Sequence, residues 1–343
     1  MRFLILTALF FCCCTGKSQT FDQDLKRIVY SYNSKGRFNG VVIVAFNKDD
    51  IRTYKFGYKD PVTKKQKIEL NDRFYLASVA KHFTGWALLQ LIDSGLVKPT
   101  DTIGKWFTEL KPKLQKVTVR QLANHTSGIP DFYDLTKDVD TLDNNKIYTM
   151  LCQLDSTDTK PGKMFNYCNA GYVLMAMLVE RVTGLKFDAY CRQFIFEPLG
   201  MKGVSFMPSK DTILCGFSPK YQKKTVTSGY CGPSGLYCKA SDFIAYYKNY
   251  LAEIEKWNGY AKMALALTDT SYFNKKLYGF GWIFANDELG SYHYHPGDEF
   301  RFFNLLQWYE EKNVMVCILS NKRDRFLNAL HRDVLELVRK QVK

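Results

Sequence analysis

A serine and a lysine three residues apart, Ser78 and Lys81, have the types and the spacing needed for nucleophilic catalysis. A serine hydroxyl is a poor nucleophile at neutral pH and needs a neighbouring base. On a helix, side chains three residues apart share a face, so the lysine can reach the hydroxyl. The apolar run over residues 83–92 predicts that this helix is buried on most sides. Burial and the positive end of the helix dipole both disfavour a charged lysine, as a lysine base requires.

Two further motifs follow along the chain and could complete such a site. Tyr167 and Asn169 stand two residues apart and can offer a proton relay and a hydrogen-bond anchor for the lysine. His295 precedes Pro296 and Gly297. The histidine could hydrogen-bond a substrate or the tyrosine, and the glycine would let the backbone approach a reacting carbonyl. Each motif alone also fits a plain structural role: a helix cap beside a solvated lysine, a turn with a packed ring, and an ordinary strand histidine.

In this order, the three motifs make the chain resemble the serine beta-lactamase and penicillin-binding-protein superfamily, particularly its class C branch with the related esterases and D-aminopeptidases. The pattern of that family is Ser-x-x-Lys, then Tyr-x-Asn, then Lys-Thr-Gly or His-x-Gly. Three other stretches resemble family signatures that carry no chemistry of their own: residues 122–130, 196–201 and 232–236. The resemblance extends over residues 36–321, nearly the whole chain after its N-terminal segment.

The resemblance implies an acyl-enzyme mechanism that needs no cofactor. Ser78 would attack a carbonyl, and Lys81 and Tyr167 would take its proton and pass it to the leaving group. Asn169 would orient Lys81 and a substrate amide. The oxyanion would lie between the backbone N–H groups of Ser78 and Asp298, next to His295 and Gly297. Water would then hydrolyse the acyl-enzyme.

Two departures from the family pattern bear on the substrate, which is expected to be a small molecule or peptide-like and could derive from peptidoglycan. His295 stands where class C beta-lactamases have a lysine, so a positive charge that would meet a substrate carboxylate is missing. This favours an esterase or a D-amino-acid peptidase over a true beta-lactamase.

Asp298 and Glu299 follow the glycine, where the family more often has small residues. A carboxylate there opposes an oxyanion, unless it points away or pairs with Arg301. It could instead select substrates that carry an amino group. The alternative function is a non-catalytic penicillin-binding-like protein, which would bind peptidoglycan fragments or acyl ligands without turnover.

Strand-like runs at both ends of the chain would position these motifs. Two runs predict a hairpin, three more predict further strands, and a closing helix follows: residues 40–46 and 51–57, then 279–284, 300–309 and 314–320, then 326–342. The middle is helix-rich, with a clear helix over 171–183 ended by Gly184. This order predicts an α+β fold of the beta-lactamase/transpeptidase type. Both chain ends form an antiparallel sheet flanked by helices, with an inserted helical subdomain.

We therefore expect one beta-lactamase-related catalytic domain over residues 19–343. Its α/β part would cover about 36–85 and 217–343, and its helical subdomain about 86–216, with the active site in the cleft between them. The length of 343 residues and the apolar content of 46% suffice for one large core or two joined subdomains.

Residues 1–18 are typical of a signal peptide, with a basic residue followed by an apolar run too short to span a membrane. The small residues Gly16 and Ser18 predict cleavage before Gln19 and a periplasmic or secreted product. The alternative is an outer-envelope lipoprotein, held at the membrane through a lipidated cysteine: Cys12, Cys13 or Cys14.

Seven cysteines follow the leader, so at least one thiol is unpaired, and no Cys-x-x-Cys pair predicts a metal site. Cys168, inside the Tyr-x-Asn motif, is expected to pack rather than to react. The net charge of +14 falls to +12 once Arg2 and Lys17 are removed with the leader. No nucleic-acid recognition motif accompanies the lysines, so we expect no nucleic-acid partner.

Overall fold

The computed structural model describes residues 6–138, 141–206, 214–226, 229–268, 272–273 and 275–342, and it describes side chains from residue 20 onward except at 272–273. The first five residues of the predicted leader lie outside this range. The rest of the leader continues into helix α1 (Leu6–Ser34). None of the helices in the described residues combines the length and apolarity that crossing a bilayer requires. Export, cleavage and lipidation therefore stay predictions.

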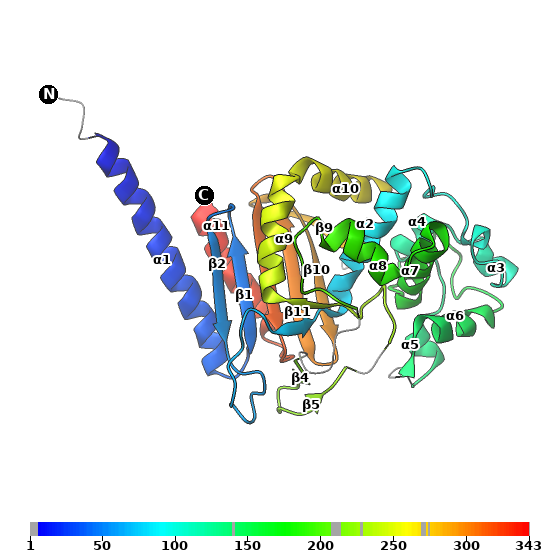
Figure 1. The fold of residues 1–343 in the computed structure, drawn as a ribbon, viewed down its shortest axis with the longest axis horizontal. Helices are drawn as coiled ribbons and strands as arrows, with labels where there is room; N and C mark the ends of the chain where they lie inside the picture. Colours follow the sequence, from blue (N-terminus) through cyan, green and yellow to red (C-terminus); the bar gives the residue numbers. More distant parts are fainter. Residues whose placement is uncertain are drawn as a thin grey trace.

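The central element is an eight-stranded sheet in which both ends of the chain meet (Figure 1). Its spatial order is β2 (Ile51–Phe56), β1 (Gly40–Ala45), β12 (Val314–Ser320), β11 (Phe302–Tyr309), β10 (Gly290–Glu299), β9 (Trp282–Asp287), β8 (Lys276–Gly279) and β7 (Tyr272–Phe273). All neighbouring strands are antiparallel. Gly40 pairs with Ser320, so the N-terminal hairpin joins the sheet through the last strand. The predicted α+β fold, with a sheet built from both ends, is confirmed.

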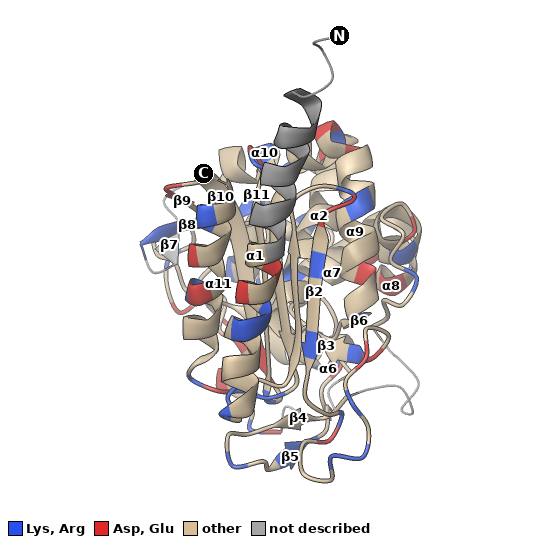
Figure 2. Cartoon of the chain, turned by 90° about the vertical axis from the view of Figure 1, so that its left-hand side faces the viewer, with Lys and Arg blue, Asp and Glu red and all other residues tan. Residues whose placement is uncertain are grey.

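Successive residues of β1 point to opposite faces of the sheet, as the pleat requires, and both faces are buried. Val42 and Val44 pack with α1 and with α11 (Leu327–Val342). These two helices lie side by side over one face (Figure 2). Val41 and Ile43 belong to the larger core on the other face. There the sheet is covered by α2 (Ala80–Asp93), α9 (Ala240–Ala252) and α10 (Ile254–Leu267).

Two short strands, β3 (Arg73–Tyr75) and β6 (Tyr237–Lys239), pair in a small second sheet. In the sequence, a helix-rich region separates these two strands. Its elements are η2 (Ile103–Lys105), α3 (Pro112–Gln115), α4 (Val119–Ala123), α5 (Phe132–Leu135), α6 (Asn144–Cys152), α7 (Asn169–Thr183), α8 (Phe187–Cys191) and a π-helical turn, η4 (Arg192–Phe196). A short hairpin of β4 (Gly216–Phe217) and β5 (Lys223–Lys224) follows. Helix α7 ends at Gly184, which takes the left-handed conformation with φ of 73°.

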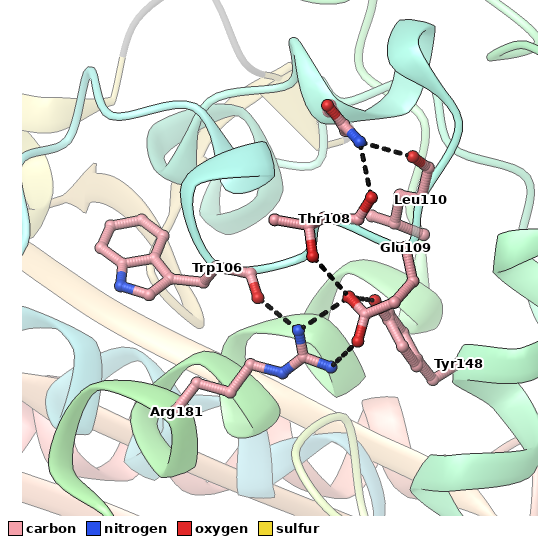
Figure 3. Close-up of polar contacts among 7 residues, drawn as sticks. Trp106, Thr108, Glu109, Leu110, Tyr148 and Arg181 are labelled. Atoms are coloured by element: carbon pink, nitrogen blue, oxygen red, sulfur yellow. Dashed lines mark hydrogen bonds and ion pairs between the residues drawn. The ribbon is translucent and has the colours of Figure 1, made fainter.

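Helix α7 is fastened to the loop that precedes α3 by a single arginine (Figure 3). The guanidinium of Arg181 donates to both carboxylate oxygens of Glu109, at 3.2 and 3.3 Å, and to the carbonyl of Trp106. Tyr148 of α6 donates to the same carboxylate at 2.8 Å. A bidentate arginine contact has a fixed geometry. It therefore ties the C-terminal end of α7 to the loop before α3 and to α6. The other end of α7 begins at the predicted Tyr-x-Asn motif.

One sequence-based expectation about elements was wrong, and one element was missed. The predicted strand over 279–284 is interrupted, because Phe280 and Gly281 form the turn between β8 and β9, with φ of 52° and 82°. A Cβ on Gly281 would lie 2.1 Å from the carbonyl oxygen of Lys81, so this turn approaches α2 closely. The helix over residues 20–34 was not predicted, although Phe21, Leu25 and Val29 recur at a spacing of four and are buried.

Candidate active site

Ser78 lies in a one-turn 3₁₀ helix, η1 (Ala77–Val79), directly before α2. The preceding residue, Ala77, has φ of 50°, in the left-handed region that residues other than glycine rarely adopt. It is completely buried, and the Leu76 N–H is fixed to the Leu236 carbonyl at 2.8 Å. Such a strained conformation persists only where the surroundings enforce it, and it occurs often at functional sites. Here it sets the position of the serine that follows.

Lys81 is completely buried in the first turn of α2, where its amine contacts three oxygen atoms. Nζ lies 2.7 Å from Asn169 Oδ1, 2.8 Å from the Pro233 carbonyl and 3.2 Å from Ser78 Oγ. Burial lowers the pKa of Lys81 to about 7, against the opposing effect of the Glu299 and Asp131 carboxylates. A neutral amine has two N–H donors, which Asn169 and Pro233 accept. Its lone pair is then left for the serine hydroxyl.

Asn169 is the first residue of α7, and its position is fixed by a carboxylate. Its side-chain amide donates to Asp131 Oδ2 at 3.0 Å, and its backbone N–H donates to the same oxygen. The amide oxygen is thereby turned toward Lys81. Cys168 caps this helix, since its Sγ accepts from the Gly171 N–H at 3.4 Å, and it is buried. This matches the packing role expected for the cysteine.

The Tyr167 ring lies between the lysine and a buried histidine. Lys81 Nζ lies 4.8 Å from the Tyr167 ring centroid. The His125 ring centroid lies 4.3 Å from the Tyr167 ring centroid, with the two rings tilted by 39°. His125 Nδ1 accepts the Cys168 N–H at 3.1 Å, which holds the loop that carries the tyrosine. The Tyr167 hydroxyl hydrogen-bonds Ser78, and burial raises its pKa well above the usual range. Tyr167 is therefore a neutral phenol, able to pass a proton on but a weak base.

His295 lies on β10, and its ring is buried in a neutral state. The Nδ1–H donates to the Pro296 carbonyl at 2.6 Å, so Nε2 is left to accept from the Tyr278 hydroxyl at 3.0 Å. Burial and the nearby Lys81 lower the pKa of His295 to about 3. A cavity of about 180 Å³ lies in front of these groups, lined by Ser78, Tyr167, Tyr278, Ile283, His295, Pro296 and Asp298. Apart from Ser78, His295 and the carboxylate residue Asp298, its walls are aromatic and apolar.

Gly297 allows β10 to pass directly beside η1. A Cβ at this position would lie 2.2 Å from the Leu76 carbonyl oxygen and 3.2 Å from Val79 N. We expect Gly297→Ala to push the strand away from the serine, lowering kcat roughly 100-fold and stability by about 1–3 kcal/mol. Steady-state kinetics and urea unfolding measure the two effects. Gly259→Ala is the matched control, since nothing lies within 4 Å of its Cβ position. Equal kinetics for the two variants would contradict the close-approach role.

The two carboxylates after Gly297 have separate surroundings. Asp298 pairs with Arg323, whose Nε lies 2.8 Å from Oδ1. Pairing with Arg301, one of the two alternatives considered from the sequence, is not found: the Arg301 guanidinium donates instead to the Gln222 carbonyl. Arg301 has φ of 69° and lies in the turn between β10 and β11, whereas Asp298 lies on β10.

Glu299 accepts hydrogen bonds from three tyrosine hydroxyls contributed by distant parts of the chain. Tyr75 donates to Oε2 at 2.7 Å, and Tyr133 and Tyr230 donate to Oε1 at 2.5 and 2.6 Å. The carboxylate thereby joins β10, β3 and α5. Its charge is the strongest of those that favour the protonated form of Lys81.

Comparison with known proteins fits this arrangement. The sequence profile of the family described as Beta-lactamase matches residues 19–339. The chain belongs to the beta-lactamase family. One relative is Penicillin-binding protein 4* of Bacillus subtilis (strain 168), which is 26% identical over 334 residues. The match covers 88% of this chain and 72% of the length of that relative. Protein flp of Staphylococcus aureus (strain N315) is 26% identical over 326 residues, covering 90% of this chain but only 64% of its own.

Solved structures of beta-lactamase fold show the same architecture. A D-amino acid amidase from Ochrobactrum anthropi SV3, complexed with L-phenylalanine, matches with a TM-score of 0.80 at 20% identity, over 94% of this chain and 100% of the amidase. A penicillin-binding protein from Bacillus halodurans matches with a TM-score of 0.77 at 21% identity, over 92% of this chain and 99% of that protein. At these identities the likeness shows the fold.

The structure of this beta-lactamase-family protein brings Ser78, Lys81, Tyr167, Asn169 and His295 into one site, with Gly297 and Asp298 along its edge. His125 and Pro233 lie in two of the stretches that resemble family signatures, 122–130 and 232–236, but no role in the site was predicted for them. The other supporting groups were not singled out from the sequence: Asp131, Tyr278 and the tyrosines around Glu299. In the described part of the chain, no cluster of three or more histidine, cysteine, aspartate or glutamate residues could hold a metal ion. The seven described cysteines are free thiols.

Proposed function

We propose that this protein is a serine hydrolase that forms an acyl-enzyme on Ser78 with an ester, amide or peptide-like substrate. The observation that carries the proposal is the position of the Lys81 amine. It lies 3.2 Å from Ser78 Oγ, and its two other contacts are both hydrogen-bond acceptors. With a pKa of about 7, Lys81 is neutral in a large fraction of molecules at physiological pH. A general base works best when its pKa lies near the working pH.

The proposed reaction begins with attack of Ser78 Oγ on the substrate carbonyl carbon, while Lys81 Nζ takes the hydroxyl proton. The backbone N–H groups of Ser78 and Asp298 would stabilise the oxyanion. As the tetrahedral intermediate collapses, the bond to the leaving group breaks. Tyr167 gives that group its proton and is reprotonated from Lys81. Water then attacks the ester on Ser78 with Lys81 again as base, and this releases the acid and the free serine.

The charges around the cavity favour substrates without a carboxylate at the reacting end. His295 is neutral, so it supplies no positive charge of the kind that meets the carboxylate of a beta-lactam. Asp298 lies on the cavity wall, and Glu299 follows it. A related fold is that of a D-amino acid amidase, solved with L-phenylalanine amide as well as L-phenylalanine. We therefore propose that an ester, or an amide or peptide of a D-amino acid, is a better substrate than a beta-lactam.

This substrate preference has a direct test in two p-nitrophenyl esters that differ only in carrying an ammonium or a carboxylate group. The ammonium ester should have a kcat/KM higher by roughly tenfold at low salt. Asp298→Asn should reduce that ratio, and added salt should reduce it too. Because Arg323 pairs with Asp298, Arg323→Gln should increase the ratio. A carboxylate ester that is hydrolysed as fast as the ammonium ester would overturn the preference.

Glu299 provides a test of the lysine base through its charge. Glu299→Gln keeps an oxygen that the tyrosine hydroxyls can use but removes the negative charge that favours protonated Lys81. The pKa of Lys81 should fall, so the acid limb of the kcat/KM profile moves to lower pH, raising the rate at pH 6 roughly two- to threefold. Glu311→Gln, an exposed change, is the control. An acid limb that stays in place would argue against Lys81 as the titrating base.

The first experiment is intact-protein mass measurement after incubation with a fluorophosphonate, a p-nitrophenyl ester, a penicillin and a D-alanyl peptide, with product release followed in parallel. Covalent labelling at Ser78 and ester turnover, with slow or no release from penicillin, would support the proposed hydrolase. The competing function is a penicillin-binding-like protein that holds an acyl group or peptidoglycan fragment without turnover. A stable adduct with no release from any substrate would favour it, and no adduct at all would remove Ser78 as nucleophile.

A further inference from the structure

A second cavity, of about 460 Å³, shares no lining residue with the one in front of Ser78. It lies where the C-terminal end of α1 meets the start of β1, the loop after β2 and the turn between β4 and β5, toward the lower end of the sheet in Figure 1. Its volume is within the range of small-molecule sites in proteins. Three lysines line it, Lys35, Lys64 and Lys322, and no aspartate or glutamate does.

Lys322 is the most unusual of these lysines, because it is only 2% exposed. Its Nζ donates to the Gly36 carbonyl and lies 3.9 Å from the centre of the Tyr221 ring. No carboxylate of the described residues forms an ion pair with it. A buried ammonium is costly unless an anion compensates its charge. A carbonyl and a ring face compensate it only in part, so the cavity offers a place for a negative group.

The backbone around Lys322 is held by several hydrogen bonds, and its ammonium group is held by the Gly36 carbonyl and the Tyr221 ring. Its N–H is tied to Ser320 Oγ at 3.2 Å, and that hydroxyl donates back to the Lys322 carbonyl at 2.9 Å. The residues on either side bond to Phe217: the Phe217 N–H donates to the Asn321 carbonyl at 2.8 Å, and the Arg323 N–H donates to the Phe217 carbonyl at 3.0 Å. The lysine is therefore preorganised in the wall of the cavity.

Lys35 and Lys64 line the cavity and are exposed, and neither has an ion-pair partner among the described residues. Lys64 has φ of 52°, held by its N–H bond to the Asp60 carbonyl at 2.9 Å. The cavity wall also includes aromatic and apolar side chains, those of Phe38, Tyr58, Pro61 and Tyr221. Three lysines thus line a cavity with an aromatic wall, a combination that suits an anion attached to a ring-shaped body.

We infer that this cavity binds a small organic anion, with a phosphate or carboxylate group at Lys322 and a sugar-sized body against the aromatic wall. The exposed Lys35 and Lys64 supply further positive charge. The site does not depend on the proposed hydrolase activity. It connects to the active site through the chain, however, because Arg323 follows Lys322 and pairs with Asp298 at 2.8 Å.

The test uses calorimetric titration of the full chain with glucose 6-phosphate, gluconate and glucose, at constant ionic strength. Saturable binding of the phosphate or the carboxylate sugar, with none of glucose, is the expected result, and the two anions together show which group is preferred. The double variant Lys35→Ala/Lys64→Ala should weaken binding roughly tenfold. The matched double variant Lys26→Ala/Lys65→Ala removes two exposed lysines from the same two segments outside the cavity. It should change binding less than about twofold.

Lys322→Met removes the buried charge with little change in volume. It should abolish binding, because the group that contacts the anion is lost. It should not lower the thermal unfolding midpoint of the free protein, because the substitution removes a buried charge that is only partly compensated. Ser78→Ala and protein labelled by fluorophosphonate should bind the anion as the wild type does, so the result is independent of the hydrolase proposal. The inference is overturned if neither anion binds, if both double variants weaken binding equally, if Lys322→Met still binds, or if labelling at Ser78 blocks binding.

Discussion

Replacing Ser78 with alanine is expected to lower kcat by at least about 10⁴-fold, because no other group of the site can form the covalent bond to the acyl group. The same change should abolish the mass increase with a fluorophosphonate. The fold should be preserved, since the hydroxyl's hydrogen-bond partners Lys81 and Tyr167 keep other contacts. Circular dichroism and urea unfolding check this. Ser94→Ala, at the opposite end of α2, is the matched control and should retain full activity and labelling.

Two outcomes of this substitution would count against the assignment. A Ser78→Ala protein that still turns over ester at more than about one per cent of the wild-type rate would mean that another residue is the nucleophile. A Ser78→Ala protein that binds substrate as the wild type does, paired with a wild type that shows no turnover, would establish a binding protein. The Ser94→Ala control excludes effects that arise only from changing this helix.

Replacing Lys81 with methionine is expected to lower kcat/KM roughly 10³-fold or more, because the serine loses its base while the buried volume is nearly kept. In the wild type, the pKa of about 7 for Lys81 predicts that kcat/KM rises about tenfold per pH unit below 7 and levels off above it. The rise reflects the neutral amine, which is the active form. The residual activity of Lys81→Met should lack this limb. Its persistence in the variant would assign the titration to another group.

The same lysine should make the free energy of unfolding depend on pH. Its pKa is lowered to about 7 in the folded protein, from its usual 10.5. Between these pH values the unfolded chain holds the proton and the folded one does not, so the free energy of unfolding rises with pH across this window. Urea unfolding at pH 7, 8 and 9 should show this rise in the wild type and a smaller one in Lys81→Met. Lys26→Met, at an exposed position, should leave the slope unchanged, and equal slopes in all three proteins would contradict the shifted lysine.

The motifs that could be predicted from sequence are those whose chemistry depends on local spacing. Ser78 and Lys81 lie on either side of the junction between η1 and α2, Tyr167 and Asn169 flank one helix cap, and His295 and Gly297 lie on one strand. The hairpin at residues 40–56 and the helix that ends at Gly184 also follow local signals. Such patterns arise from contacts between near neighbours, which a sequence shows directly.

The groups that escaped prediction depend on contacts between distant parts of the chain. The Glu299 carboxylate meets Tyr75, Tyr133 and Tyr230, and nothing in the sequence near Glu299 signals them. Asp131 reaches Asn169 across 38 positions in the sequence. Proximity along the chain does not decide pairing either: Arg301 lies close to Asp298 in sequence, but the ion pair forms with Arg323.

The closure of the sheet by β1 against β12 has a consequence for how the chain reaches this structure. All six residues of β1 are buried, and their partners along one edge are residues 315–320. Bringing such distant segments together costs entropy before any contact is made, so folding is expected to be slow compared with that of a helical bundle of similar stability. During synthesis, the apolar strand at 40–45 cannot pair with β12 until about 270 further residues have been made. A nascent chain stopped before β12 would expose that strand, and it should be a substrate for holding chaperones or a seed for aggregation.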